Sequence, residues 1–398
     1  MLLVFQSIIV YGLIIWVMAY FGKIAYKSQY PNGFDNKDMF YGKDMSLSSL
    51  LTKSYYLIPI LVFSTFAALR YKVGTDCESY KYIYYEISQY GTSLRAQNIE
   101  SGFISLVSLT NSLSDSHYIF MFVLAFLQIV PLYYAQRKAT YSLVFFGLVL
   151  IFSGTYLSLM NGIRQNIAAC FFVALLPFVL EKKKWAWYIL GVILATTMHK
   201  SAYILFALGV LAYFLQYKIP NKYIQLALLA TCFILMDKVQ INSIAELFSI
   251  YGTEAGYDEG AINAYTNTEA MTKTFGFRSM LLLTTYIITI CYNDKMKLYF
   301  NSKVFNMQYN LFFLGICLFL LFYNDFVIGR LLYYLKIFIP IITSTTLFYL
   351  WKNKSKNNRL MFKVMITILL IHFAYELYSG MQEFPNESVL YKFDIFRL

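Results

Sequence analysis

Residues suited to proton transfer and to anion binding flank two apolar runs near the middle of the chain. Arg164 precedes the apolar stretch 166–198, which is interrupted by the basic turn 181–184, and His199 and Lys200 follow it. A basic turn between two membrane spans is expected on the cytoplasmic side, so Arg164 and His199 are expected together at the outer face. Polar residues at a membrane edge are costly and commonly serve a function. We therefore place a candidate active site at this outer edge.

His199 is the candidate base of this site. A neutral imidazole can accept a hydroxyl proton near neutral pH, although a lone histidine at a helix end often serves only as an interfacial hydrogen-bonding group. We expect the cations Arg164 and Lys200 to surround His199 and keep it neutral. His117 and His372 have no such neighbours in the sequence, and we interpret both as structural.

Asp76 is the second outer-face group with suitable chemistry. Neighbouring cations would make its carboxylate a weaker base, so we expect Asp76 to position sugar hydroxyls or an arginine. The residues that we predict to be catalytic are therefore His199, Asp76 and Arg164.

A set of cations maps to outer loops or outer span ends, against the usual enrichment of positive charge inside. A single side chain of this kind can simply extend to the lipid headgroups. The set as a whole suggests an anionic substrate such as a pyrophosphate, which a guanidinium group binds through two hydrogen bonds. The residues that we predict to bind pyrophosphate are Arg70, Arg164, Arg278, Arg330 and Lys200.

The segment 237–274, expected to be external, carries tyrosines among acidic residues. Aromatic faces can stack on sugar rings and carboxylates can accept hydrogen bonds from sugar hydroxyls, although an ordinary solvated loop has the same composition. The residues that we predict to bind a glycan are Gln165, Tyr80, Tyr251, Tyr257 and Tyr265. No Gly-rich phosphate loop, paired metal-ligand motif or serine-nucleophile elbow occurs in the sequence, so we predict neither a metal nor a cofactor.

The composition predicts an all-α polytopic membrane protein that would hold these residues at one membrane edge. Hydrophobic residues make up 59% of the 398 residues and charged residues 14%, whereas a soluble chain is about a quarter charged. The net charge of +12 comes largely from lysines in short loops, which indicates topology and not nucleic-acid binding. We expect a single membrane domain over residues 1–398, with 2–21 as a retained span and not a signal peptide.

About twelve spans with both termini outside account for the apolar runs. Two polar regions are expected outside the membrane: an interfacial segment 70–116 with amphipathic helices, and the large loop 237–274. The expected spans are about 2–21, 55–69, 118–134, 141–159, the two runs within 166–198, 202–217, 223–236, 275–292, 309–323, 329–351 and 360–378.

Several of these residues lie in blocks that resemble a known family. The stretch 70–76 (Arg-Tyr-Lys-Val-Gly-Thr-Asp) with Tyr80 resembles the arginine, valine-glycine-x-aspartate, tyrosine signature of EpsG-like (Wzy-type) polysaccharide polymerases. The stretch 100–103 (Glu-Ser-Gly-Phe) is similar to the next block of that family. Residues 163–168 and 199–202 resemble its two middle blocks. Cys77 departs from the pattern, because an aromatic residue is expected there.

The resemblance implies a fold similar to the GT-C glycosyltransferases and a location in a bacterial inner (cytoplasmic) membrane. It implies a metal-independent enzyme that joins polyprenyl-pyrophosphate-linked oligosaccharide repeat units at the outer face. The product would be O-antigen, capsule or exopolysaccharide. The implied partners are that lipid-linked oligosaccharide, the membrane lipid and, as a further candidate, a chain-length regulator.

Two other functions are compatible with a polytopic chain of this size. A flippase or exporter of the same lipid-linked oligosaccharide would need charges near the bilayer midplane and often has repeated halves, whereas here the charges gather at one edge. A membrane O-acyltransferase would need a polar path for a cytosolic acyl donor to reach His199, and the sequence shows no such path.

Overall fold

The computed structural model describes residues 2–34, 46–74, 76–91, 99–236, 275–382 and 389–394, and these residues are almost entirely helical. Within these ranges the only β-type pairing is an isolated bridge between Arg70 and Phe393. Five helical segments are long and apolar enough to cross a membrane, and seven shorter helices are also apolar. The prediction of an all-α membrane protein is confirmed. The loop 237–274 lies outside the described residues.

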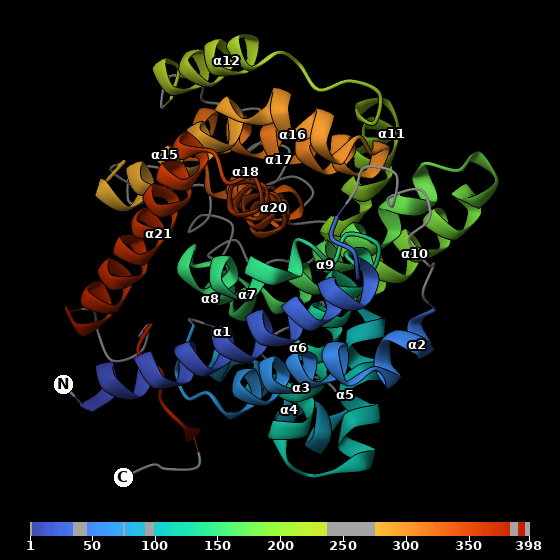
Figure 1. The fold of residues 1–398 in the computed structure, drawn as a ribbon. Helices are drawn as coiled ribbons and strands as arrows, with labels where there is room; N and C mark the ends of the chain where they lie inside the picture. The colour runs from blue at the N-terminus through green and yellow to red at the C-terminus, as the bar shows by residue number, and fades with distance from the viewer. Residues whose placement is uncertain are drawn as a thin grey trace.

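Figure 1 shows the helices of the first half of the chain in blue to yellow-green. They are α1 (Leu2–Gln29), α2 (Leu47–Thr52), α3 (Ser54–Leu69), α4 (Cys77–Tyr90), α5 (Ser101–Leu113), α6 (His117–Ala135), α7 (Leu143–Phe152), α8 (Thr155–Met160), α9 (Ile163–Val179), α10 (Trp185–Met198), α11 (Ile204–Leu215) and α12 (Lys222–Ile234). Short 3₁₀ turns, Lys182–Lys184 and Lys200–Tyr203, precede α10 and α11.

The second half packs against this group. Its helices are α15 (Phe277–Cys291), α16 (Asn293–Phe300), α17 (Lys303–Leu321), α18 (Phe326–Leu331), α19 (Tyr333–Lys336), α20 (Phe338–Lys352) and α21 (Lys356–Gln382). Helix α19 packs on α9 and α20 packs on α7, so the two halves share one hydrophobic core.

One expected span is interrupted, which corrects the prediction of a continuous helix there. The span expected over 141–159 is divided into α7 and α8 at Gly154, whose backbone has φ +73°, a conformation that ends an α-helix. The span expected over 329–351 corresponds to Ile328–Lys352, one of the five long segments, in which α18, α19 and α20 follow one another through residues that keep helical backbone angles. Apolar composition predicts burial, but it does not show where the backbone leaves the helical conformation.

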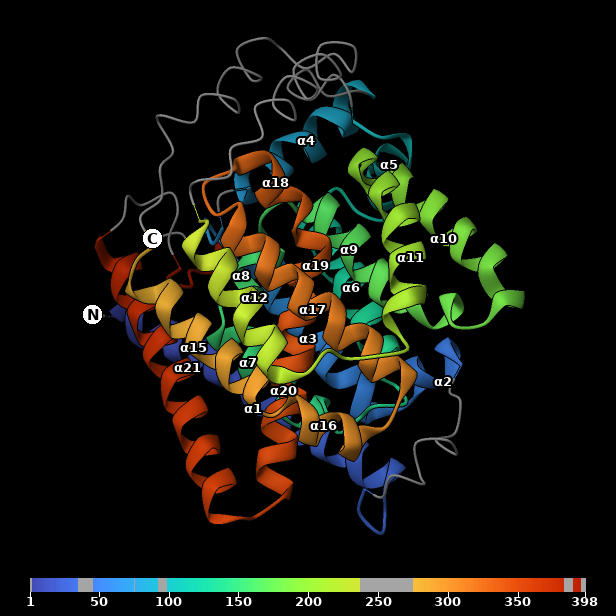
Figure 2. The same ribbon diagram turned by 90° about the horizontal axis from the view of Figure 1, so that it is seen from above.

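A second, smaller hydrophobic cluster lies at one end of the bundle, where α4 and α5 cover the ends of α6 and α9. Its members include Tyr80, Tyr84, Phe103, Phe120 and Ile167, all at most 5% exposed. Figure 2 shows α4, α5 and α18 at this end, and α16 with the lysine-rich α20–α21 connection at the other. The amphipathic helices expected in the interfacial segment are therefore present and pack as a layer over one end of the apolar helices.

Candidate active site

Glu100 joins two residues that the sequence analysis selected. It is the N-cap residue of α5, but its side chain caps no amide of that helix and extends to α9 and α10 instead. One carboxylate oxygen accepts a hydrogen bond from the Arg164 guanidinium. The other lies 3.0 Å from His199 Nδ1 and accepts a 2.9 Å hydrogen bond from the Lys200 backbone amide. The predicted proximity of Arg164 and His199 is therefore present, and a carboxylate connects them.

The charge state of Glu100 decides which nitrogen of His199 carries hydrogen. Burial alone would raise the pKa of Glu100, but the hydrogen bond from His199, the charge of Arg164 and the Lys200 amide together lower this pKa to about 2. An ionised carboxylate can only accept hydrogen bonds, so Nδ1 of His199 is the donor. The neutral imidazole then has its lone pair on Nε2, on the side of the ring away from Glu100.

The polypeptide places these side chains at three helix ends. His199 follows the last residue of α10 in an extended conformation, with φ −158° and ψ 123°. Arg164 lies in the first turn of α9, and Glu100 directly precedes α5. Helices α5 and α10 approach closely here, as shown by Gly102, where an added Cβ atom would overlap the Thr197 side chain. The glycine of the 100–103 block is thus needed for the Glu100–His199 contact.

Helix α4 holds the start of α9. Asp76 Oδ2 accepts a 2.5 Å hydrogen bond from the amide of Gly162, which has φ +54° and caps α9. The Tyr80 hydroxyl accepts a 3.3 Å hydrogen bond from the Arg164 amide, and burial raises the pKa of this phenol. Asp76 therefore contacts the backbone beside Arg164, and its expected role in positioning sugar hydroxyls or an arginine stays a prediction.

Gln165 brings the second half of the chain to the site. Its side-chain amide donates a 2.8 Å hydrogen bond to the carbonyl of Arg330, a residue of α18 that is exposed. The hydroxyl groups of Ser201 and Tyr334 lie 2.9 Å apart and make a second connection. The structure thus brings Arg330 next to the residue that follows Arg164, whereas the role expected for Gln165 was contact with a glycan.

Two of the expected pyrophosphate ligands lie in other contacts. Arg70 is only 2% exposed, and its guanidinium donates to the carbonyls of Ala67 and Val73. Arg278 forms an ion pair with Glu376 at 2.8 Å. These contacts differ from that of Arg164, which forms an ion pair with Glu100. A position near the outer end of a span did not distinguish these arginines from Arg164.

The three histidines have more similar surroundings than their sequence neighbours suggested. His117 Nε2 lies 3.0 Å from Asp394 Oδ2, which also accepts from Lys81. His372 Nε2 lies 3.6 Å from Glu376, the partner of Arg278. Both histidines therefore have charged partners that come from distant segments, and their structural role stays a prediction. The charged group bonded to the ring of His199 is Glu100, which also binds Arg164 and the Lys200 amide.

Glu100 is the site residue that the sequence analysis missed. A signal was available, because Glu100 opens the 100–103 block and precedes an amphipathic helix that is too polar for an ordinary span. The tyrosines proposed for glycan binding at 251, 257 and 265 lie outside the described residues. In the described part of the chain, no group of three or more His, Cys, Asp or Glu side chains is placed to hold a metal ion.

Comparison with known protein families gives a match that covers most of the chain. The model of the EpsG family matches residues 53–388, a stretch that contains every described residue of the site. No curated protein and no solved structure matches the chain. Because the family match covers most of the chain, and the site residues lie within it, this protein belongs to the EpsG family.

Proposed function

We propose that this protein is a membrane glycosyltransferase that polymerises oligosaccharide repeat units linked to a polyprenyl pyrophosphate. Membership of the EpsG family supports a polymerase type of function in exopolysaccharide or O-antigen synthesis. The observation that carries the proposal is the Glu100 carboxylate, which holds one histidine and one arginine side by side at one end of a membrane bundle. A base and a cation are the two groups that such a transfer requires.

In the proposed reaction, a hydroxyl of the acceptor repeat unit attacks the anomeric carbon of the growing chain. The new carbon–oxygen bond forms as the bond to the pyrophosphate breaks, and the bonding electron pair leaves with the pyrophosphate. His199 Nε2 accepts the hydroxyl proton, because Glu100 holds the hydrogen of the neutral ring on Nδ1. Glu100 thus orients the base and stabilises the imidazolium that forms, in the manner of the aspartate of a serine-protease triad.

Arg164 and Arg330 are the cations that we assign to the leaving pyrophosphate, with Lys200 as a third. The Arg164 side chain is 21% exposed, and its bond to Glu100 uses one of the two terminal guanidinium nitrogens. Arg330 and Lys200 are exposed. Placed cations stabilise the negative charge that grows on the departing oxygens. Arg70 is left out of this assignment because it is buried against backbone carbonyls, and Arg278 because its ion pair with Glu376 lies in a different cluster from Glu100.

The proposed location is a bacterial cytoplasmic membrane, with about twelve spans and with the site facing outward. The positive-inside rule supports this orientation, because the basic turn 181–184 and the lysines at 352, 354 and 356 lie in short connections. Cysteines introduced at Lys200 and Lys183 test it. The first should react with an impermeant thiol reagent applied from outside, and the second only after the membrane is opened. External labelling at Lys183 would overturn the orientation.

Purified protein in liposomes with a lipid-linked repeat unit tests the reaction. The unsubstituted protein should extend the glycan, and His199→Ala should lose about a hundredfold to ten-thousandfold in rate, as removal of a general base commonly does. Binding of the lipid-linked unit, measured separately, should persist in this variant. If His199→Ala extends chains at a near-normal rate while Asp76→Asn is inactive, the two roles must be exchanged.

The same assay separates the proposal from the alternatives. Movement of single repeat units across the bilayer without elongation would identify a flippase. Acylation of a glycan would identify an acyltransferase. Either result would overturn the polymerase assignment.

A further inference from the structure

Residues 389–394 form a C-terminal segment that joins four helices of the first half. The Val389 carbonyl accepts a 2.8 Å hydrogen bond from the Tyr11 hydroxyl of α1, and the Tyr391 amide donates to Ser7 of the same helix at 2.7 Å. The Tyr391 hydroxyl donates to the Phe66 carbonyl of α3. Beyond α3, the carbonyl of residue 392 accepts a 2.8 Å hydrogen bond from the amide of residue 71. The segment is therefore fixed to the bundle through its backbone.

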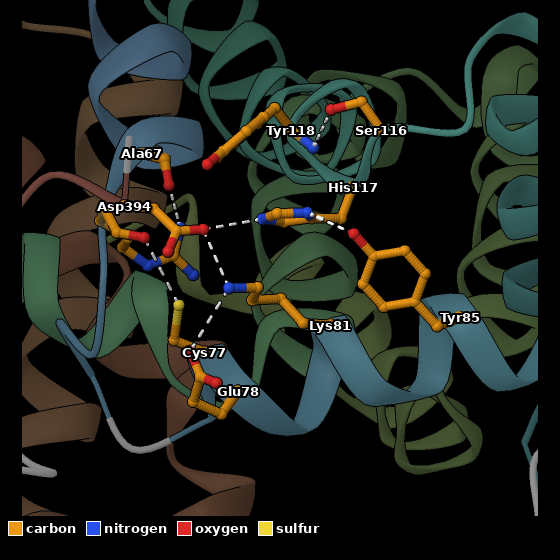
Figure 3. A network of polar contacts seen from close by, with 10 residues as sticks. Ala67, Cys77, Glu78, Lys81, Tyr85, Ser116, His117, Tyr118 and Asp394 are labelled. Carbon is orange, nitrogen blue, oxygen red and sulfur yellow. Dashed lines mark hydrogen bonds and ion pairs between the residues drawn. The ribbon is translucent and has the colours of Figure 1, made fainter. Parts of the chain in front are cut away.

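Asp394 ends this segment in a buried cluster of charges (Figure 3). Its Oδ2 atom lies 2.9 Å from Lys81 Nζ of α4 and 3.0 Å from His117 Nε2 at the start of α6. The Asp394 side chain is 1% exposed and that of Lys81 is 9% exposed. His117 Nδ1 also lies 2.9 Å from the hydroxyl of Tyr85, another residue of α4. Asp394 thus connects the C-terminal segment to both α4 and α6.

A buried ammonium group needs a partner, because removing one member of a buried ion pair leaves an uncompensated charge. Glu78 lies 3.6 Å from Lys81 Nζ, but it is 33% exposed and one helical turn away on the same helix. Lys81 Nζ also lies 5.7 Å from the centre of the Tyr71 ring, but the negative charge that pairs with Lys81 from another part of the molecule is that of Asp394. Loss of the Asp394 charge would therefore favour movement of Lys81, and of α4 with it, toward solvent.

Helix α4 is also the helix that holds the start of α9. Asp76 and Tyr80 accept hydrogen bonds from the amides of Gly162 and Arg164. Lys81 is the next residue after Tyr80, so a shift of α4 at Lys81 moves the Tyr80–Arg164 contact. A displacement of about 1 Å in a catalytic group can cost about a hundredfold in rate.

We propose that Asp394 is a positioning residue, which holds α4 through Lys81 so that Asp76 and Tyr80 keep the Arg164 end of α9 in place. The effect on turnover rests on the proposed function, whereas the effect on α4 does not.

The native thiol of Cys77 reports the position of α4 without any assay of activity. Cys77 is the first residue of α4, is 1% exposed and lies against the Arg70 carbonyl. In the unsubstituted protein it should resist an impermeant maleimide. Asp394→Asn, which keeps the shape of the side chain but removes its charge, should raise the labelling rate of Cys77 at least about tenfold. Cys77→Ser in the same background assigns the signal to this thiol.

The same Asp394→Asn protein should show a kcat lowered about ten- to a hundredfold with KM within about twofold, because alignment is lost and the substrate ligands remain. Asp394→Glu should restore most of both properties. Lys81→Met removes the other member of the Lys81–Asp394 ion pair. This variant is used in place of Asp394→Asn if Asp394→Asn fails to insert into the membrane. The control is Asp294→Asn, the same change in an exposed pair with Lys297, which should alter neither property.

Two results would overturn the proposal. If Cys77 stays protected in both Asp394→Asn and Lys81→Met, the C-terminal segment does not hold α4. If Cys77 becomes reactive while kcat is unchanged, Asp394 has no positioning role. Failure of the unsubstituted protein to polymerise would refute the proposed function, and the labelling of Cys77 would still decide whether Asp394 holds α4.

Discussion

Two clusters with the same kinds of side chain lie beside α4 and differ in how much of each is exposed. Glu100 contacts His199 and Arg164, and Asp394 contacts a histidine and Lys81. Both carboxylates are almost fully buried, at 5% and 1% exposure. The side chains of His199 and Arg164 are 20% and 21% exposed, whereas those of the histidine and lysine at Asp394 are 10% and 9% exposed.

The difference separates a reactive arrangement from a supporting one. A substrate can reach a base and a cation only where both have exposed surface, and the Glu100 cluster meets this requirement better than the Asp394 cluster. A third cluster contains His372, Glu376 and Arg278. It leads to the same conclusion, because its histidine is 1% exposed and lies inside α21. We therefore expect these similar triads of carboxylate, histidine and cation to serve different purposes, which their exposure and location distinguish.

The largest expected effect comes from Glu100→Gln. The neutral amide no longer fixes the hydrogen of His199 on Nδ1 or balances Arg164, and loss of such an orienting carboxylate costs on the order of ten-thousandfold in rate. We expect a loss of about 10³- to 10⁴-fold in polymerisation, measured with purified protein in liposomes. Glu181→Gln is the matched control, since Glu181 is exposed and pairs with Lys184 at the basic turn. Near-normal polymerisation by Glu100→Gln would show that the Glu100 cluster, like the Asp394 cluster, takes no direct part in the reaction.

Arg164→Ala should have the next largest effect. Removing one preorganised contact to developing charge typically costs about 2 to 4 kcal/mol of transition-state stabilisation. Lysine should restore only part of the rate, because it lacks the planar, two-pronged donor geometry. The rate with lipid-linked substrate is the measurement, and the exposed Arg359→Ala is the control. Long polymer from correctly inserted Arg164→Ala protein would remove Arg164 from the site.

Gly102→Ala should have a smaller effect, transmitted through the backbone. A methyl group at this position overlaps Thr197, so α5 must move away from α10 and carry Glu100 from His199. Overpacking of this kind costs about 1 to 3 kcal/mol of stability, and we expect about a tenfold loss of rate. Gly12→Ala in α1 is the control, because nothing lies within 4 Å of its added methyl group. Equal behaviour of the two variants would contradict the close α5–α10 contact.

The smallest expected effect is the pH dependence of the stability change caused by Glu100→Gln. The folded-state pKa of Glu100 is lowered from 4.5 to about 2, so its contribution to stability is fully present above about pH 4.5 and is lost as the pH falls towards 2. Between pH 8 and pH 5, the decrease in unfolding temperature that Glu100→Gln causes in detergent should therefore not become smaller, because Glu100 stays ionised over this range. A shift that shrinks between pH 8 and pH 5 would show that Glu100 gains a proton in that range.

The sequence determined the parts of this description that depend on local pattern. Apolar runs and basic turns predicted the helical membrane class, and the spacing across one hairpin predicted that Arg164 and His199 meet. The blocks around Asp76 and Glu100 predicted the family. These inferences need only the period of a helix, the charge of a loop and the order of short motifs.

The tertiary structure decided which charged groups face one another. Glu100 meets His199 and Lys81 meets Asp394 across long stretches of chain, and no helical or loop pattern specifies such pairs. Arg70 and Arg164 both lie near ends of apolar helices, yet packing buries the first against backbone carbonyls and leaves part of the second exposed. The physical reason is that a residue's type fixes its capacity for hydrogen bonds and charge, while its partners depend on how distant helices pack.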